Sequence, residues 1–138
     1  MPEYPTLLHR WFDEVWNQRN ESAIDEMMIE DVVVHGLGEE PIVGRENFKS
    51  FYRSFSSAFP DAHVTVEDVI TQGDRMSCRC TVRATHTGEG LGFPPTNKPV
   101  EFTGGGICAT RDGKFVEVWN EFDFMKMNNQ MGVLSFNI

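Results

Sequence analysis

Hydrophobic residues in the first half of the chain recur with the spacing of helices. Apolar side chains return every three or four positions over residues 6–19 and again over residues 45–59. Asn20 is a good N-cap for a second, short helix, and Pro60 ends the third. A short β-rich run occupies residues 31–37. The pattern therefore predicts three N-terminal helices with one strand between the second and the third.

The second half of the chain changes to a period of two, which is typical of strands. Residues 62–88 alternate between apolar and polar side chains around a tight turn at residues 72–74. Two further runs, residues 99–110 and residues 114–124, are predicted to pair as a hairpin. A last helix is expected over residues 124–131. Four long antiparallel strands should thus follow the helices.

This order predicts an α+β fold in a single domain that spans residues 1–138. Strands longer than the usual five or six residues curve, and helices laid over a curved sheet enclose a pocket. We therefore expect a curved mixed or antiparallel sheet, wrapped by the three N-terminal helices around an apolar pocket. A loop over residues 88–98, rich in glycine and proline, lies beside that pocket.

The amino-acid composition and net charge limit the kinds of molecule that the protein can bind. The chain has 138 residues, of which 40% are hydrophobic and 24% charged, as expected of a soluble globular protein. Its net charge of −9 argues against binding to nucleic acid or to an anionic membrane surface, because both require a positive patch. Three cysteines without a CxxC motif favour reduced thiols and a cytoplasmic location.

Strand alternation indicates which polar side chains face inward: His35, Asp68, His86 and Asn120. Histidine can transfer protons near neutral pH, and an asparagine amide can donate to a carbonyl or enolate oxygen. Each could instead be a core residue with satisfied hydrogen bonds. Asp123 is a further candidate for catalysis, although its simplest role is to cap the last helix. The spacing of these residues indicates no metal site.

The segment "THTGEGLGFPPTNKPVEFTG" and the later "RDGKFVEVWNEFD" carry a family resemblance that extends over nearly the whole chain. Both resemble the SnoaL-like polyketide cyclases, or ester cyclases, of the nuclear-transport-factor-2-like superfamily. The resemblance implies a cone-shaped α+β barrel with a deep apolar cavity and a homodimer formed through the outer face of the sheet. Residues Glu117, Trp119 and Glu121 fall on that face, toward solvent or a partner chain.

The resemblance also implies acid/base chemistry without metal or organic cofactor. The catalytic aspartate of the ring-closing members falls on Asn120. The histidine that assists in those members maps to the strand over residues 104–108, which contains no histidine here. We therefore expect an enzyme of cyclase, lyase or isomerase type that acts on an apolar, carbonyl-containing small molecule. His86 or His35 would move the proton, and Asn120 would hold the oxygen. The alternative is a binding domain that kept the cavity and lost the chemistry; a third reading is a purely structural dimer module.

The apolar ligand is expected to meet the pocket walls and a covering loop. These substrate contacts are Phe12, Trp16, Phe51, Phe55, Leu91, Phe93, Phe102 and Phe122.

Overall fold

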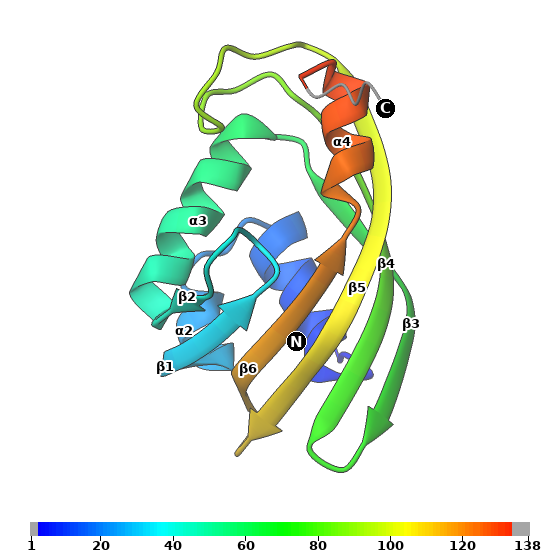
Figure 1. Ribbon diagram of the computed structural model, residues 1–138. Helices are drawn as coiled ribbons and strands as arrows, with labels where there is room; N and C mark the ends of the chain where they lie inside the picture. Colours follow the sequence, from blue (N-terminus) through cyan, green and yellow to red (C-terminus); the bar gives the residue numbers. More distant parts are fainter. Residues whose placement is uncertain (1–2, 134–138) are drawn as a thin grey trace.

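The computed structural model describes residues 3–133, in which helices cover one curved sheet (Figure 1). The helical segments are α1 Leu7–Arg10, the π-helical segment η1 Trp11–Asn17, α2 Ala23–Met27, α3 Arg45–Ala58 and α4 Phe124–Met131. The strands are β1 Met28–His35, β2 Ile42–Val43, β3 His63–Gln72, β4 Arg75–Thr85, β5 Pro99–Arg111 and β6 Lys114–Phe122. The predicted α+β class is confirmed, and so is the order of elements apart from the short strand β2, which was not predicted.

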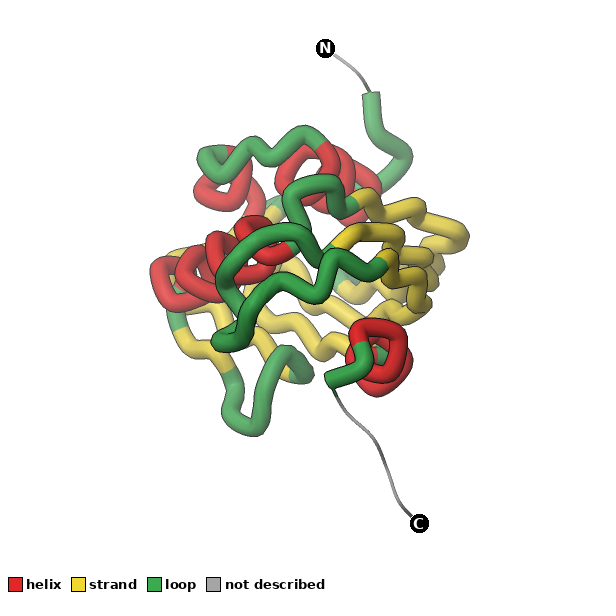
Figure 2. The backbone as a smooth tube through the Cα atoms, turned by 90° about the horizontal axis from the view of Figure 1, so that it is seen from above, coloured by secondary structure: helices red, strands yellow, loops and turns green. Residues whose placement is uncertain are grey.

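The strands form one sheet in the order β2-β1-β6-β5-β4-β3. β1 runs parallel to β6 and the other neighbours are antiparallel, so the sheet is mixed. In Figure 1 the long strands β3 to β6 bend together, the N-terminal helices lie on their hollow side, and α4 lies along one end of β5. Seen from above in Figure 2, the loop between β4 and β5 crosses from α3 toward α4. The sheet stays open, and the helices complete the wall.

Local signals in the sequence set most helix ends. The Thr6 hydroxyl accepts a hydrogen bond from the amide of His9 at the start of α1. Asp123 caps α4 by accepting from the amide of Lys126 at 3.0 Å, and Gly132 ends this helix with a φ of 75°. The second helix is the exception: it begins at Ala23, after a turn over residues 20–22.

A β-bulge in β3 decides which residues of that strand face the core. The pairing with β4 shifts between Val66 and Asp68, so residues beyond the bulge change face. The expected inward position of Asp68 is therefore wrong. Its carboxylate lies on the outer face, 2.8 Å from Nε of Arg79. Val69 packs against the core in its place.

Close backbone approach explains the run of three glycines in the middle of β5. A Cβ at Gly104 would collide with the ring of Phe122, and one at Gly105 would collide with the carbonyl oxygen of Cys78. A Cβ at Gly106 would collide with the carbonyl oxygen of Trp119. These glycines allow β4, β5 and β6 to approach each other where the sheet bends.

The segment from Leu7 to Asn17 winds first as an α-helix and then as a π-helix. Its π-helical part includes a hydrogen bond from the amide of Gln18 to the carbonyl oxygen of Asp13, five residues earlier. In an α-helix, side chains five residues apart point about 140° away from each other. The wider π-helical turn brings residues five apart to the same side. Trp11 and Trp16 thereby both face the sheet.

Two side-chain amides take the place of a neighbouring strand. The Asn17 amide donates to the carbonyl oxygen of Val64 at 3.0 Å and accepts from its N–H at 2.8 Å, which joins η1 to β3. The Gln130 amide makes the same pair of bonds with Glu101, at 3.0 and 2.8 Å, and joins α4 to β5. No helix in residues 3–133 has both the length and the apolar character needed to cross a membrane.

Replacing Asn17 by Ala should lower the free energy of unfolding by about 1–3 kcal/mol, because both backbone groups of Val64 lose their partner. The midpoint of urea-induced unfolding measures this loss. Asn129→Ala is the matched control, since Asn129 is exposed on α4. Equal losses in the two variants would contradict a clamp between η1 and β3.

Candidate functional site

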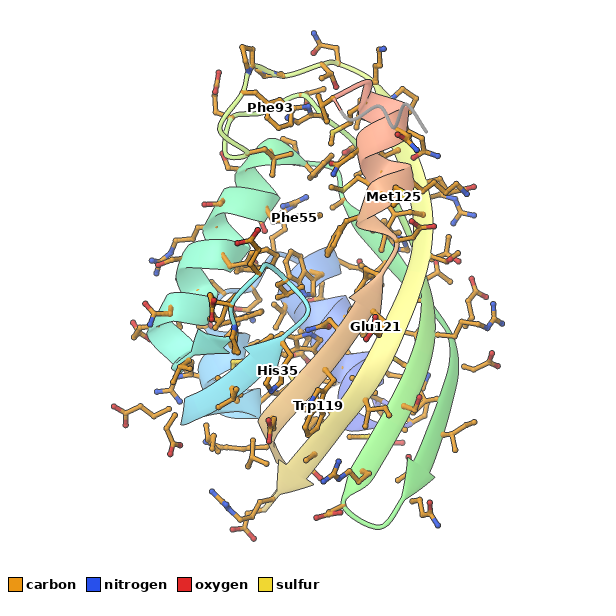
Figure 3. All side chains as sticks on the ribbon, viewed as in Figure 1. His35, Phe55, Phe93, Trp119, Glu121 and Met125 are labelled. Carbon is orange, nitrogen blue, oxygen red and sulfur yellow. The ribbon has the colours of Figure 1, made fainter. Side chains whose placement is uncertain are left out.

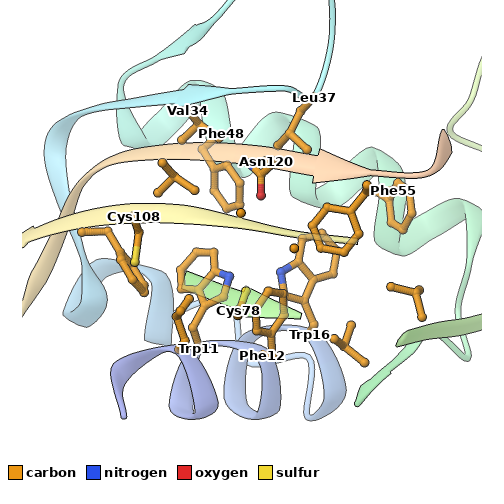
Figure 4. A pocket seen from close by; sticks show the side chains of 18 of the residues that line it. Trp11, Phe12, Trp16, Val34, Leu37, Phe48, Phe55, Cys78, Cys108 and Asn120 are labelled. Atoms are coloured by element: carbon orange, nitrogen blue, oxygen red, sulfur yellow. The ribbon is translucent and has the colours of Figure 1, made fainter. Parts of the chain in front are cut away.

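A cavity of about 90 Å³ lies between the hollow face of the sheet and the helices η1 and α3. Its walls are almost entirely aromatic and aliphatic (Figure 4). Sites that hold drug-sized ligands measure about 300–1,000 Å³. A ligand of this cavity is therefore compact, or it displaces side chains on entry.

Six of the eight predicted substrate contacts lie in the wall of this cavity: Phe12, Trp16, Phe51, Phe55, Phe102 and Phe122. Leu91 and Phe93 belong to the loop above it and pack against the core without joining the wall. Figure 3 shows Phe93 on this loop, beyond Phe55. The contacts of all eight with a ligand stay a prediction.

Asn120 of β6 places an amide in this apolar wall. Its Nδ2 donates to the backbone carbonyl oxygen of His35 at 3.0 Å. Because a carbonyl can only accept, the nitrogen of the amide must face His35, and the oxygen is left for the cavity. Figure 4 shows this oxygen directed into the cavity. Whereas the sequence predicted a donor at this position, the structure presents an acceptor.

The indole groups of Trp11 and Trp16 supply the donors of the cavity. Both line it, and in Figure 4 their nitrogens turn toward its middle. Trp11 is 7% exposed; within residues 3–133 neither indole N–H makes a hydrogen bond to the protein, and neither is among the fully buried polar atoms, so both are open to the cavity. Sequence reasoning placed Trp16 in the wall for its apolar surface and missed both donors. The sequence carried no signal for this convergence, because side chains five residues apart point away from each other in an ordinary α-helix.

Cys78 and Cys108 are the ionisable side chains among the described residues of the wall. All three cysteines are free thiols. The Cys80 thiol donates to Sγ of Cys78 across 3.9 Å, and this contact together with the amide of Gly106 lowers the pKa of Cys78 below its usual 9.0. The same contact and burial raise the pKa of Cys80. Burial raises the pKa of Cys108 to about 12. Cys78 is therefore the thiol that ionises most readily.

His86 is buried beside the cavity, between the rings of Phe59 and Phe93, each 5.4 Å away. Its Nδ1 accepts from the amide of Thr96 at 3.1 Å, so in the neutral ring the proton sits on Nε2. That Nε2 is buried without a partner in the described part of the chain. His86 thus holds the loop between β4 and β5 in place. It faces inward as predicted but is not part of the described wall.

The predicted inward position of His35 is wrong. Val32 and Val34 are the buried residues of β1, and His35 follows Val34 onto the other face. There its ring stacks on Trp119 at 5.6 Å, and its Nε2 lies 2.7 Å from Oε2 of Glu117 (Figure 3). The run of three valines has no alternation, so the sequence could not indicate which face is buried. A role for His35 in proton transfer within this cavity has no support from its position.

Asp123 lies at the surface, where it caps α4. The structure therefore brings only Asn120, of the four predicted catalytic residues, into the wall of the cavity. Within residues 3–133, no cluster of three or more His, Cys, Asp or Glu side chains is placed to hold a metal ion.

A curved mixed sheet wrapped by N-terminal helices around an aromatic cavity is the cone-shaped fold of the nuclear-transport-factor-2-like proteins. The sequence pattern of the SnoaL-like polyketide cyclases matches residues 6–131, and the chain belongs to this family. The predicted family and fold are both confirmed.

Solved structures of similar proteins agree with this assignment. IdmH of Streptomyces antibioticus, a candidate polyketide cyclase, is 31% identical, with a TM-score of 0.78 over 92% of this chain and 96% of its own. AclR of Streptomyces galilaeus, a candidate hydroxylase, is 26% identical, with a TM-score of 0.80 over 96% and 86% of the two chains. A SnoaL-like protein of Jannaschia sp. CCS1 shares the fold at 20% identity, with a TM-score of 0.84 over 98% and 99%. A comparison with curated proteins found no match.

The bond between Asn120 and His35 predicts a pH-dependent loss of stability in Asn120→Asp. A carboxyl group can donate to the His35 carbonyl only when it is protonated, so folding raises its pKa above the ordinary value of about 3.9. Its stabilising bond is present at low pH and is lost as the pH rises through the raised pKa. Relative to the wild type, the variant should lose about 1–3 kcal/mol of unfolding free energy by about pH 8, and less at about pH 4.5.

Urea unfolding at both pH values measures this difference. Asn129→Asp, at an exposed position, is the control and should show no comparable trend. A deficit of Asn120→Asp that is the same at both pH values would show that the amide nitrogen does not face His35.

Proposed function

We propose that the protein is a cofactor-independent enzyme of cyclase, lyase or isomerase type that acts on an apolar, carbonyl-containing small molecule. The observation that carries this proposal is the set of polar atoms in the apolar cavity, two indole N–H groups and the oxygen of Asn120. Donors in a site that excludes water stabilise an oxygen on which negative charge develops. The family relationship supports the same class of chemistry.

In this proposal the residues of the cavity take different roles from those expected from the sequence. Trp11 and Trp16 donate to the carbonyl or enolate oxygen, while the oxygen of Asn120 accepts from a hydroxyl group of the ligand. His35 and His86 are not among the described lining residues, so proton transfer falls to the Cys78 thiol or to water at the open side of the cavity. The wall residues Phe12, Phe102 and Phe122 surround the apolar body of the ligand.

A second candidate function is binding without conversion. An amide stands where ring-closing relatives are expected to carry an aspartate, and an amide cannot remove an α-proton. A domain of this kind would hold the same ligands by the same contacts and release them unchanged.

The outer face of the sheet is the surface we propose for a homodimer. Ile107 of β5 is 48% exposed there and pairs in register with Trp119 of β6. The guanidinium of Arg75 lies 5.2 Å from the centre of the Trp119 ring, on whose plane His35 also stacks. An exposed apolar side chain beside a flat aromatic group resembles the centre of a protein interface.

Exchange of α-protons for deuterium tests the catalytic proposal without knowledge of the natural substrate. Acetophenone and 3′-hydroxyacetophenone are incubated with the protein in D₂O, and the loss of the methyl signal is followed by NMR. The wild type and Asn129→Ala should both exceed the buffer rate by about tenfold or more, as expected of general acid–base catalysis. Trp16→Phe should be slower, because one donor to the enolate is lost.

Binding of the same two ketones, measured by calorimetry, completes the experiment. The hydroxyl compound should bind more tightly to the wild type by about tenfold, and Asn120→Leu should remove this preference. Binding without exchange would favour the carrier function and overturn the catalytic one. Absence of binding by both ketones would overturn both functions.

A further inference from the structure

We propose that Cys78 is a site of covalent capture for compact α,β-unsaturated ketones, with Trp11 and Trp16 holding the ketone oxygen. This inference does not rest on the proposed function, because it concerns the nucleophilicity of one thiol and requires no turnover. It concerns the same cavity, which both kinds of ligand would enter.

The Cys78 thiol is accessible from the cavity, and its surroundings favour the thiolate. It lies on β4 with its side chain in the wall of the cavity, while Cys80, two residues along the same face, is fully buried behind it. The Cys80 thiol donates to the Cys78 sulfur across 3.9 Å. β5 places the Gly106 amide opposite Cys78 in register, and that amide also favours the thiolate. Since the thiolate is the nucleophile of a cysteine, Cys78 is poised to react.

The indole of Trp11 independently indicates a ligand with an acceptor oxygen. This side chain is more than nine-tenths buried, and its N–H is directed into the cavity without a partner among residues 3–133. An N–H that faces an apolar cavity without an acceptor is available to the oxygen of a ligand, and pairing with that oxygen is favourable. Trp16 directs a second N–H toward the same region, as Figure 4 shows. A carbonyl oxygen satisfies both donors, because it has two lone pairs.

The size and polarity of the cavity limit the part of the ligand that carries the carbonyl group. The remaining wall is apolar, and the volume of about 90 Å³ admits a small ring but no large polycyclic compound without movement of side chains. A thiolate on one side and two donors for oxygen match an electrophile whose reactive carbon is conjugated to a carbonyl group. A cyclic enone has this combination of features.

The addition balances without a further reagent. The Cys78 thiol first loses its proton to water. Sγ of the thiolate then forms a bond to the β-carbon of the enone, the π electrons of the carbon–carbon double bond shift to join the α-carbon to the carbonyl carbon, and the π electrons of the carbonyl bond move onto its oxygen. The two indole N–H groups stabilise the resulting enolate. Water then protonates the α-carbon. The product is a thioether ketone, in which sulfur and hydrogen have been added across the double bond.

Mass spectrometry of the wild-type protein treated with 2-cyclohexen-1-one tests the site. Peptide mapping should find the adduct on Cys78, while Cys80 and Cys108 of the same molecule serve as internal controls. The rate should saturate as the enone concentration rises, and cyclohexanone, which binds but cannot add, should slow the reaction. Adduct on the other cysteines to an equal extent, or a rate that stays linear in enone, would overturn the proposal.

Two variants and a pH profile separate the contributions. Cys78→Ser should abolish the saturable adduct, and Trp11→Phe should slow its formation by about tenfold, because one donor to the enolate is lost. Circular dichroism verifies that each variant is folded. The rate for the wild type should rise with pH to a midpoint below 9.0, the ordinary value for a thiol. A midpoint above that value, or an unchanged rate in Trp11→Phe, would contradict the assigned arrangement.

Discussion

The close approach of three backbones at the middle of β5 is the constraint on which the rest of the structure depends. Gly104, Gly105 and Gly106 leave no space for a Cβ, so β4, β5 and β6 can lie together where the sheet bends. The bend gives the sheet a hollow face, and helices packed on that face leave a cavity between them. A side chain at any of these positions would push the strands apart and flatten the wall opposite η1.

Much of the fold could be predicted because period and end signals are local properties of the sequence. The stripe of α3, the Asp123 cap and the Gly132 stop each act within a few residues. Which face of a strand is buried is harder to predict, since a single β-bulge moves every residue that follows it to the opposite face. For this reason Asp68 was misplaced, and His35, after three consecutive valines, offered no alternation from which to choose.

The candidate site was predicted in its apolar part and missed in its polar part. Aromatic residues at helical spacing predict the apolar wall of the cavity, whereas the direction of a side-chain amide depends on its hydrogen-bond partner. Asn120 turns its oxygen inward because the carbonyl of His35, 85 residues earlier, takes its nitrogen. The two indole donors converge because η1 winds as a π-helix, and no local signal in the sequence announced that winding.

The paired hydrogen bonds of the Asn17 and Gln130 amides also protect exposed backbone groups of the sheet. Each occupies backbone groups that would otherwise be open to a strand from another chain, one on the edge strand β3 and one on β5. Unprotected edges invite strand addition and, with it, aggregation. At these two points side-chain amides already occupy the backbone groups that a further strand would need, so the sheet cannot be extended there.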